Sequence, residues 1–482
     1  MLDIRAEPRD PGMKGDMLAT AGSHGDPQVR IGPEVIEEWK RSPMCPAHGE
    51  VTFVGDYEEG VQVLRSRAFR TNRFTAEGTN PVWVVVGEDR SVRFAATDGR
   101  GDPTEPAVDW ATVLAGADTL SSLQGEEHKR RRRALSPIFG RGSHRWYHDT
   151  AIGPTIGRSL QGALDSADED GVVHVDLVPF THRLFVQLTA GLVGLDGVED
   201  DERADALADL FERMHEAAPM TVPADALTEA AMTDALAARD EFKQRFVDPS
   251  QAAREELVAR SRRGEIGEEE LPRDYLTLVA KGADTFDSAE TVLNQAFPLF
   301  SGSTGTSTLV VLHMLQDLFA WHEEHPEIGA IPTDPDFLEH ALAETIRLQN
   351  PGLPFITRFA VEDSDLAGGR HVDAGEVVNL YLPAVNEDPA AFGEDAHRFD
   401  PTRETPAGIP AYGLGFGGGV HMCPATPLVL GEGGISGTIV PTVAALLRAG
   451  AEPDPDRPPV RRPEIEKLDP TIESFPVLLH RR

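Results

Sequence analysis

The segment over residues 286–322 constrains the fold most, because it is the longest strongly apolar stretch with helical spacing in the sequence. Its apolar residues lie nearly all the way round the expected helix, and a helix without a polar face is typical of a protein interior. Other elements must then cover it on every side. The sequence therefore predicts a large, mainly helical domain assembled around this segment.

Small polar residues occupy the middle of this helix, from Ser301 to Thr308. Serine and threonine hydroxyls compete for backbone hydrogen bonds, and each glycine costs a helix about 1 kcal/mol relative to alanine. Two explanations stay open at this point. The helix either bends there to leave room for a ligand, or it kinks and its hydroxyls bond to its own backbone.

A second unusual stretch runs from Phe416 to Cys423 and places one cysteine after a cluster of glycines, with His421 two residues before it. Glycines allow a sharp turn and a close approach to a bulky planar group. A cysteine thiolate binds soft metals, and axial ligation of a haem needs one sulfur on a shielding loop. The stretch is therefore either a haem-binding loop or a glycine-rich turn with a buried free thiol.

The rest of the chain shows shorter patterns. Spaced apolar residues predict helices over residues 57–66, 125–137, 150–168, 178–195, 200–218, 224–247, 250–263, 336–349 and 436–448. Short strands are expected over residues 51–56, 83–86, 355–360, 377–382 and 475–480. We expect most of residues 70–120 to form a loop over a binding site, and residues 1–50 to form a loosely ordered arm. The predicted fold class is mainly α with a small β region, in one large domain over residues 51–482.

Composition narrows the setting of the protein. Two cysteines, Cys45 and Cys423, are too few for a disulfide framework, which favours a reducing cytosol. No apolar run reaches the roughly 18–20 residues of a membrane span, and the first residues lack the apolar core of a signal peptide. The net charge of −35 argues against nucleic-acid binding. We therefore expect a soluble, cytoplasmic protein with no membrane or nucleic-acid partner.

Six motifs that follow one another along residues 50–480 resemble the cytochrome P450 family of haem-thiolate monooxygenases. The family's loop signature FGxGxHxC is matched by Phe416–Cys423, and its ExxR helix by Glu344 and Arg347. The other four matches are His128-x-x-x-Arg132, Thr357-Arg358, the turn Asn386–Pro389 and the meander His397–Pro401. Any one of them is weak evidence, but six in the family's order are specific. The chain resembles the soluble bacterial members.

The resemblance implies a cofactor and the residues that hold it. The cofactor is haem b (iron protoporphyrin IX), with Cys423 as the axial metal ligand. Residues implied to contact the haem or its propionates are His128, Arg132, Arg358, Phe416, Gly417 and His421. Two carboxylates in a dry cleft need such cationic or hydrogen-bonding partners. A structural triad of Glu344, Arg347 and Arg398 is implied behind the haem.

The resemblance also implies a reaction and its partners. It implies activation of dioxygen and oxidation of a small-to-medium apolar or aromatic substrate, in secondary metabolism or catabolism, by a monomeric enzyme. The pocket stretches are apolar with hydroxyls, among them Phe211, Phe300 and Phe355. Electrons come from a ferredoxin-like or flavodoxin-like donor with an NAD(P)H reductase. The basic run Lys129–Arg133 is the expected docking patch for that acidic donor.

The central helix departs from the family pattern. Members usually carry AGxET or AGxDT, in which an acid and a threonine relay protons. One register places Thr304 at the acid and Gly305 at the alcohol, and a second places Thr308 at the alcohol. Neither supplies a carboxylate, and Thr304, Thr306 and Thr308 remain the candidate catalytic hydroxyls. This leaves open a monooxygenase with altered proton delivery, a peroxygenase or other oxidant (coupling, nitration), and a haem-binding sensor without turnover.

The region after the cysteine departs as well. Pro424 stands where another residue would offer a backbone N–H to the sulfur. With fewer donors the thiolate should be more electron-rich and the iron potential lower. Gly431, Gly433 and Gly434 lie where the family has a regular helix, so we expect an irregular helix start there.

Overall fold

The structure is a computed structural model that describes residues 51–71, 82–116, 118–218, 226–282, 285–352, 354–461 and 471–481. Its α-helices are α2 (Tyr57–Arg65), α3 (Trp110–Ala115), α4 (Gly125–Phe139), α5 (Arg141–Tyr147), α6 (Gly153–Leu164), α7 (Leu177–Val193), α8 (Asp201–His215), α9 (Glu229–Phe242), α10 (Asp248–Arg262), α11 (Tyr275–Ala280), α12 (Ala289–Glu324), α13 (Pro335–Gln349), α14 (Leu382–Asn386), α15 (Pro389–Phe392), α16 (Thr426–Leu430) and α17 (Ile439–Arg448). Short π-helical or 3-10 turns cover His148–Ile152, Lys243–Val247, Glu268–Glu270, Pro326–Ile328 and Gly419–His421. The predicted arm over residues 1–50 lies outside the described residues.

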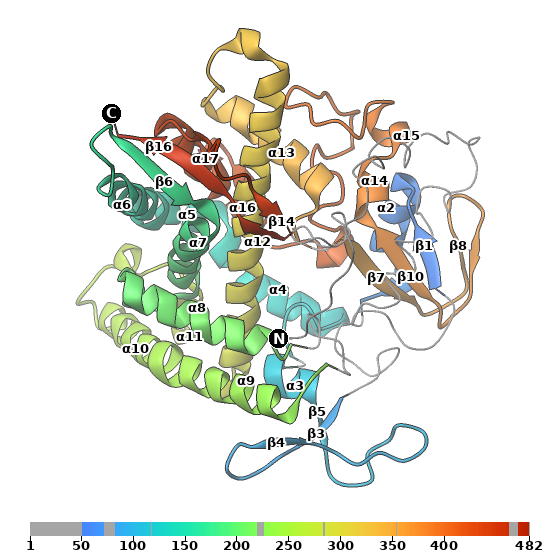
Figure 1. Ribbon diagram of the computed structural model, residues 1–482. Coiled ribbons are helices and arrows are strands. Elements are labelled where there is room, and N and C mark those ends of the chain that lie inside the picture. Colours follow the sequence, from blue (N-terminus) through green and yellow to red (C-terminus); the bar gives the residue numbers. More distant parts are fainter. Residues whose placement is uncertain are drawn as a thin grey trace.

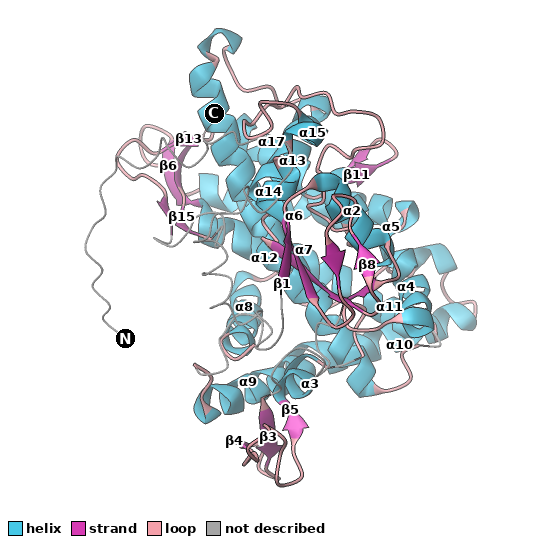
Figure 2. Cartoon of the chain, turned by 90° about the vertical axis from the view of Figure 1, so that its right-hand side faces the viewer, coloured by secondary structure: helices cyan, strands magenta, loops and turns pink. Residues whose placement is uncertain are grey.

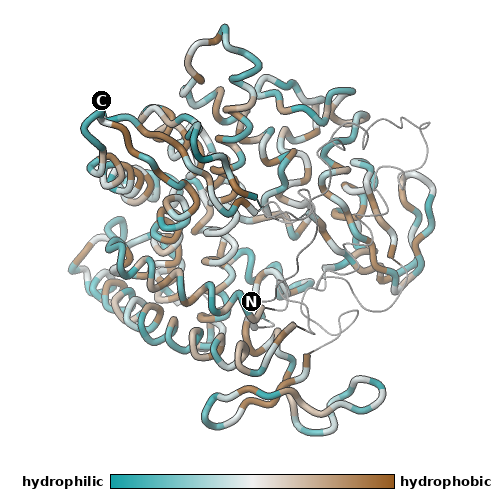
Figure 3. The backbone as a smooth tube through the Cα atoms, viewed as in Figure 1, coloured by the Kyte–Doolittle hydropathy of each residue, from teal (hydrophilic) through white to brown (hydrophobic). Residues whose placement is uncertain are grey.

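The strands form small sheets at the periphery of the helices. One mixed sheet has the order β1-β10-β7-β2, from Val51–Val54, Val377–Tyr381, Phe355–Ala360 and Phe69–Arg70. A second has the order β13-β16-β6, from Glu452–Pro453, Pro476–His480 and Val172–Asp176. Parts of both sheets are brown in Figure 3, the colour of hydrophobic residues. Three further sheets are two-stranded: β8 (Ser364–Asp365) with β9 (His371–Val372), β11 (Gly431–Glu432) with β12 (Ile435–Ser436), and β14 (Val460–Arg461) with β15 (Ile472–Ser474).

Helix α12 runs through the centre of the molecule, as Figure 1 shows. It begins where the Ser288 side chain accepts a hydrogen bond from the Thr291 N–H, which satisfies one free donor of the first turn. Helix α7 packs along it, and α3, α13 and α17 also contact it. Most of its apolar side chains are buried in one continuous core that reaches from Val84 to Leu479. The prediction of a mainly helical domain with a small β region is confirmed.

Two parts of the chain differ from the sequence expectations. Residues 82–116 form a three-stranded sheet, β4 (Val92–Phe94), β3 (Trp83–Val86) and β5 (Val108–Asp109), followed by α3, rather than a long loop. Figures 1 and 2 show this sheet projecting from one end of the molecule. The loop prediction was wrong because the glycines and aspartates that we took for loop residues occupy the turns of the sheet. The predicted irregularity of the helix after Cys423 is confirmed, since the β11–β12 hairpin separates the short α16 from α17.

No helix among the described residues is long and apolar enough to cross a membrane. The predicted cytoplasmic location stays a prediction.

Candidate functional site

The Phe416–Cys423 loop is closed by its own backbone. The Cys423 N–H donates to the Phe416 carbonyl at 2.9 Å, and the Thr426 hydroxyl at the start of α16 donates to the Cys423 carbonyl at 2.8 Å. These bonds fix the thiol between the loop and α16. The cysteine takes part in no disulfide and is half-buried.

Two glycines of this loop are required by its geometry. Gly417 and Gly419 have φ angles of 69° and 63°, which side chains with a Cβ rarely adopt. A Cβ on Gly419 would lie 2.1 Å from the carbonyl oxygen of Leu64 at the end of α2. The glycines that the sequence placed before the thiol therefore let the loop press against α2.

Four predicted haem-contacting side chains converge beside this loop. The rings of His128, from α4, and His421 have centroids 4.1 Å apart. The Arg132 guanidinium, one turn further along α4, donates to the Met422 carbonyl at 2.7 Å. Burial, together with the neighbouring positive charges of His128, Arg358 and Arg132, lowers the pKa of His421 to about 3. This coupling places Arg358, from β7, in the same cluster.

The cluster fits a ligand with two carboxylates. Burial lowers the pKa of Arg132, and no carboxylate of the described residues lies within ion-pair distance of it. Two arginines and two imidazoles thus create a positive, partly desolvated surface beside a thiol. An anionic group that enters this surface would recover the cost of burying the cations. The propionates of a haem meet that requirement, so the residues present fit the cofactor that the sequence implies.

A buried ion-pair network braces the loop from behind. Arg347, fully buried in α13, makes two bonds to Glu344 at 2.6 and 2.7 Å and donates to the carbonyls of Asn386 and Ala396. The Asn386 side chain in turn accepts from the Leu414 N–H at 2.8 Å, just before the loop. The ExxR pair is therefore linked by hydrogen bonds to the segment that leads to the thiol.

The prediction that Arg398 completes the triad with Glu344 and Arg347 was wrong. Arg398 lies at the surface, with a side chain 63% exposed that pairs with Glu324. Arg403 takes its place: its Nε donates to Glu344 at 2.9 Å, and its side chain is 7% exposed. Arg403 also bonds to Asp395 and to the carbonyls of Phe392 and Arg398. The meander motif pointed to Arg398, but the turn at Asp400 brings the later arginine inward.

One face of α12 is open. Gly302 and Gly305 are exposed and Thr306 is half-buried, although they lie in the middle of a central helix. At 100° per residue these three share a face, whereas Thr304 and Thr308 point to the opposite side and are 4% and 5% exposed. Thr306 also lies near Gly352, shortly before β7, because a Cβ there would be 3.9 Å from the Thr306 methyl group. The geometry therefore favours a register in which Thr306 is the alcohol and Gly305 stands in the acid's place.

The hydroxyls of α12 differ in their bonds. Thr306 donates to the Gly302 carbonyl at 2.6 Å, and Thr308 donates to the Thr304 carbonyl at 3.0 Å. The buried Thr304 hydroxyl has no hydrogen-bond partner among the described residues. Helix α12 is continuous across this run, so the hydroxyls are accommodated by back-bonding and not by a break. Cβ atoms built on Gly302 and Gly305 would meet no atom within 4 Å, so packing does not require glycine at either position.

The sulfur keeps two backbone donors despite Pro424. Burial raises the pKa of the Cys423 thiol, while the N–H groups of Ala425 and Thr426 and the charge of Arg132 lower it. Proline removes the donor that its own position would have offered.

Replacing Pro424 by leucine should restore a third donor. We expect the ferric/ferrous potential of the haem-loaded protein to rise by tens of millivolts, because a hydrogen bond to the sulfur withdraws electron density from the thiolate and weakens its stabilisation of the ferric iron. Spectroelectrochemical titration measures this. A potential equal to that of the unchanged protein would contradict the role given to Pro424.

The predicted basic docking patch is divided by the fold. Arg131 is buried and bonds to Thr285 and the Asp118 carbonyl, and Arg132 turns toward the thiol loop. Lys129 and Arg130 pair with Glu126 and Glu127 on the same helix. Arg133 alone of the five is exposed without an ion pair among the described residues.

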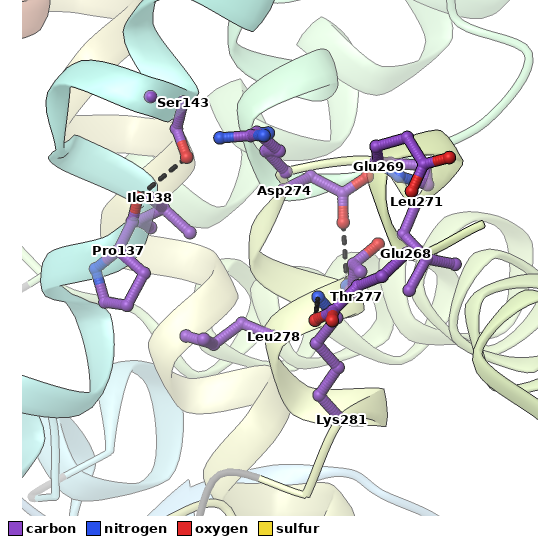
Figure 4. A pocket seen from close by; sticks show the side chains of 13 residues that line it. Pro137, Ile138, Ser143, Glu268, Glu269, Leu271, Asp274, Thr277, Leu278 and Lys281 are labelled. Atoms are coloured by element: carbon purple, nitrogen blue, oxygen red, sulfur yellow. Dashed lines mark hydrogen bonds and ion pairs between the residues drawn. The ribbon is translucent and has the colours of Figure 1, made fainter. Parts of the chain in front are cut away.

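Other hollows do not coincide with this cluster. Figure 4 shows one of about 560 Å³ between the end of α4 and residues 268–281. Its lining includes none of the predicted haem-contacting residues. The predicted pocket residues Phe211 and Phe300 are buried, and their rings stack with centroids 4.0 Å apart. Their contact with a substrate stays a prediction. Among the described residues no group of three or more His, Cys, Asp or Glu side chains could hold a metal ion.

Comparisons with known proteins agree with this geometry. The family model for cytochrome P450 matches residues 333–428, which include Glu344, Arg358 and Cys423. Cytochrome P450 monooxygenase PikC of Streptomyces venezuelae is 30% identical over 256 residues, which cover 48% of this chain and 56% of PikC. The 6-deoxyerythronolide B hydroxylase of Saccharopolyspora erythraea is 35% identical over 113 residues, 23% of this chain and 26% of the hydroxylase. The chain thus aligns with about half, or less, of the length of these relatives.

Solved structures match over nearly the whole chain. CalO2 has a TM-score of 0.63 at 20% identity, with 95% of this chain and 99% of CalO2 covered. P450BioI, solved in complex with an acyl carrier protein ligated to hexadec-9Z-enoic acid, has a TM-score of 0.62 at 18% identity, with 89% and 92% covered. At these identities the likeness concerns the fold.

Proposed function

We propose that this chain, which belongs to the cytochrome P450 family, is a haem-thiolate monooxygenase that oxidises a small-to-medium apolar or aromatic substrate. One observation carries the proposal: the thiol loop lies against Arg132 and the adjacent rings of His128 and His421, and among the described residues no ion pair joins Arg132 to a carboxylate.

Each group of residues would have a separate role in such a site. Cys423 would hold the iron, and His128, Arg132, Arg358 and His421 would hold the two propionates. When bound, a thiolate-ligated haem supplies dioxygen activation, because electron donation from sulfur favours O–O cleavage. Phe416 and Gly417 belong to the loop that shields the sulfur. The brace of Glu344, Arg347 and Arg403 would hold the segment that leads into the loop, through the bond from Arg347 to the Asn386 carbonyl.

Thr306 is the hydroxyl placed to hold a proton on the open side. Its Oγ1 donates a hydrogen bond to the Gly302 carbonyl, and the lone pairs of the same oxygen can accept a hydrogen bond from a proton donor. Gly305 supplies no carboxylate behind it, so the donor must be water or a polar group of the substrate itself. We propose substrate- or water-assisted proton delivery. Use of peroxide in place of dioxygen is the second candidate, favoured by the missing acid.

A turnover experiment separates these functions. The haem-loaded protein is supplied with a surrogate ferredoxin, its reductase and NADPH in one arm and with hydrogen peroxide alone in the other, after a spin-shift screen for ligands. Product only with the electron donor supports a monooxygenase, and product with peroxide alone supports a peroxygenase. Haem binding without product in either arm would favour a sensor and contradict the proposal.

The electron donor is proposed to be ferredoxin-like or flavodoxin-like, and the divided basic run predicts which residue it meets. Arg133→Glu should slow the first electron transfer more than Lys129→Glu, because the Lys129 charge is already paired with Glu126 at 2.6 Å. Stopped-flow reduction at several salt concentrations measures both variants. Equal slowing by the two charge reversals would count against this assignment.

A further inference from the structure

A cavity of about 460 Å³ lies between the projecting sheet, α3 and α9, close to the first turn of α12. Its charged lining consists of Arg90, Arg239, Lys243, Asp240 and Glu290, and Thr112 adds a hydroxyl. Each cation has a carboxylate partner: Arg90 pairs with Asp240, Arg239 with Glu290, and Lys243 with Asp248 at 2.7 Å, just outside the lining. None of these residues belongs to the site proposed for the haem.

Arg239 is buried with donors to spare. Its side chain is 6% exposed, and its hydrogen bonds to Glu290 and to Asn294 (2.6 Å) both use Nη2. A guanidinium carries five N–H donors, and burying it is costly unless they are used. The Nε and Nη1 groups of Arg239 therefore remain for a ligand on the cavity side.

Arg90 stands in a backbone conformation that does not suit it. Its φ angle of 66° lies in the left-handed region, which costs a residue with a Cβ about 1–2 kcal/mol. The side chain crosses to α9 and bonds Asp240 through Nε and Nη2 at 2.8 and 2.7 Å. Glycine or asparagine would relieve the turn, so the guanidinium itself accounts for arginine at this position.

Lys243 opens a π-helical turn, Lys243–Val247, at the end of α9. Such turns are rare and shift the helix phase, and they often occur at functional sites. Lys243 lies four residues after Arg239, so both side chains leave the same face of α9. The positive end of the α12 dipole lies near the same cavity, since Glu290 belongs to the first turn of that helix.

We infer that this cavity is a binding site for a small oxyanion, a carboxylate or a phosphate carried by a small molecule. Three locally unfavourable features, a buried guanidinium, a strained turn and a π-helical turn, bring cations to one place in an acidic protein. The free N–H groups of Arg239 and the free Nη1 of Arg90 match the oxygens of such a group. The site is separate from haem binding and does not depend on the proposed reaction.

Binding is tested on the full-length protein, with haem if it is retained, by the midpoint of thermal unfolding in phosphate, in succinate and in chloride at equal ionic strength. We expect a saturable rise with phosphate or succinate that chloride does not give. Arg90→Gln and Lys243→Gln should each raise the dissociation constant about tenfold or more, because each removes a charge-assisted bond or a nearby charge. Isothermal titration calorimetry with the same probes gives the constants directly.

Arg213→Gln is the matched control. Arg213, on α8, also makes two hydrogen bonds to one carboxylate, that of Asp234 on α9, at 2.9 and 2.7 Å. It does not line the cavity. Its loss should leave anion binding unchanged. No saturable effect of either oxyanion beyond that of chloride, or an equal loss of binding in Arg213→Gln, would overturn the inference.

Discussion

Arg403→Ala is expected to lower the free energy of unfolding by about 3–5 kcal/mol, the usual cost of removing one partner of a buried ion pair. Glu344 would lose the Nε bond at 2.9 Å and keep its two bonds to Arg347. The carbonyls of Phe392 and Arg398 would lose their donors as well. Chemical denaturation followed by circular dichroism measures the change, and we expect weakened haem retention in parallel.

Arg398→Ala is the control, because sequence reasoning assigned the brace to Arg398. Its side chain is exposed and pairs with an equally exposed Glu324, and surface pairs are worth about 0–1 kcal/mol. We therefore expect little change in stability. A larger loss of unfolding free energy in Arg398→Ala than in Arg403→Ala would contradict the assignment of Arg403 to the network around Glu344.

Thr306→Val is expected to reduce the product formed per NADPH consumed by about 100-fold, the lower range for loss of a positioned proton-transfer group. Valine keeps the shape of threonine and removes the hydroxyl that bonds to Gly302. Electron transfer should continue, so NADPH is consumed while peroxide accumulates. Parallel assays of product, NADPH and peroxide give this ratio.

Thr304→Val and Thr308→Val are matched controls on the other face of α12. Both side chains are buried, and the Thr304 hydroxyl has no partner, so its removal should leave coupling intact and not destabilise the fold. A larger loss of coupling in Thr304→Val or Thr308→Val than in Thr306→Val would return the site to one of the registers expected from sequence.

The sequence was sufficient wherever a local pattern decides the structure. The apolar stretch over residues 286–322 predicted a central helix because burial on all sides leaves no polar face, and α12 confirms it. The order of the motifs predicted that His128, Arg132 and His421 come together, and the structure places them side by side. Their roles toward a haem stay predictions.

The sequence was insufficient where several local solutions compete. Arg398 and Arg403 lie five residues apart in one turn-rich segment, and only the path of the chain after Asp395 decides which faces Glu344. The run Ser301–Thr308 offers a hydroxyl or glycine at every position, so the register depends on which face of α12 the neighbouring helices cover. Residues 82–116 form a sheet because strands β3 to β5 pair with one another and with α9, a non-local arrangement that turn-rich composition conceals.

The carbon-monoxide difference spectrum of the reduced, haem-loaded protein tests the central claim, that Cys423 is the axial ligand. We expect the red-shifted band that gives cytochromes P450 their name, and its replacement in Cys423→His by the band of an imidazole-ligated haem. Absence of the red-shifted band in the unchanged protein, or the same spectrum before and after the substitution, would contradict it.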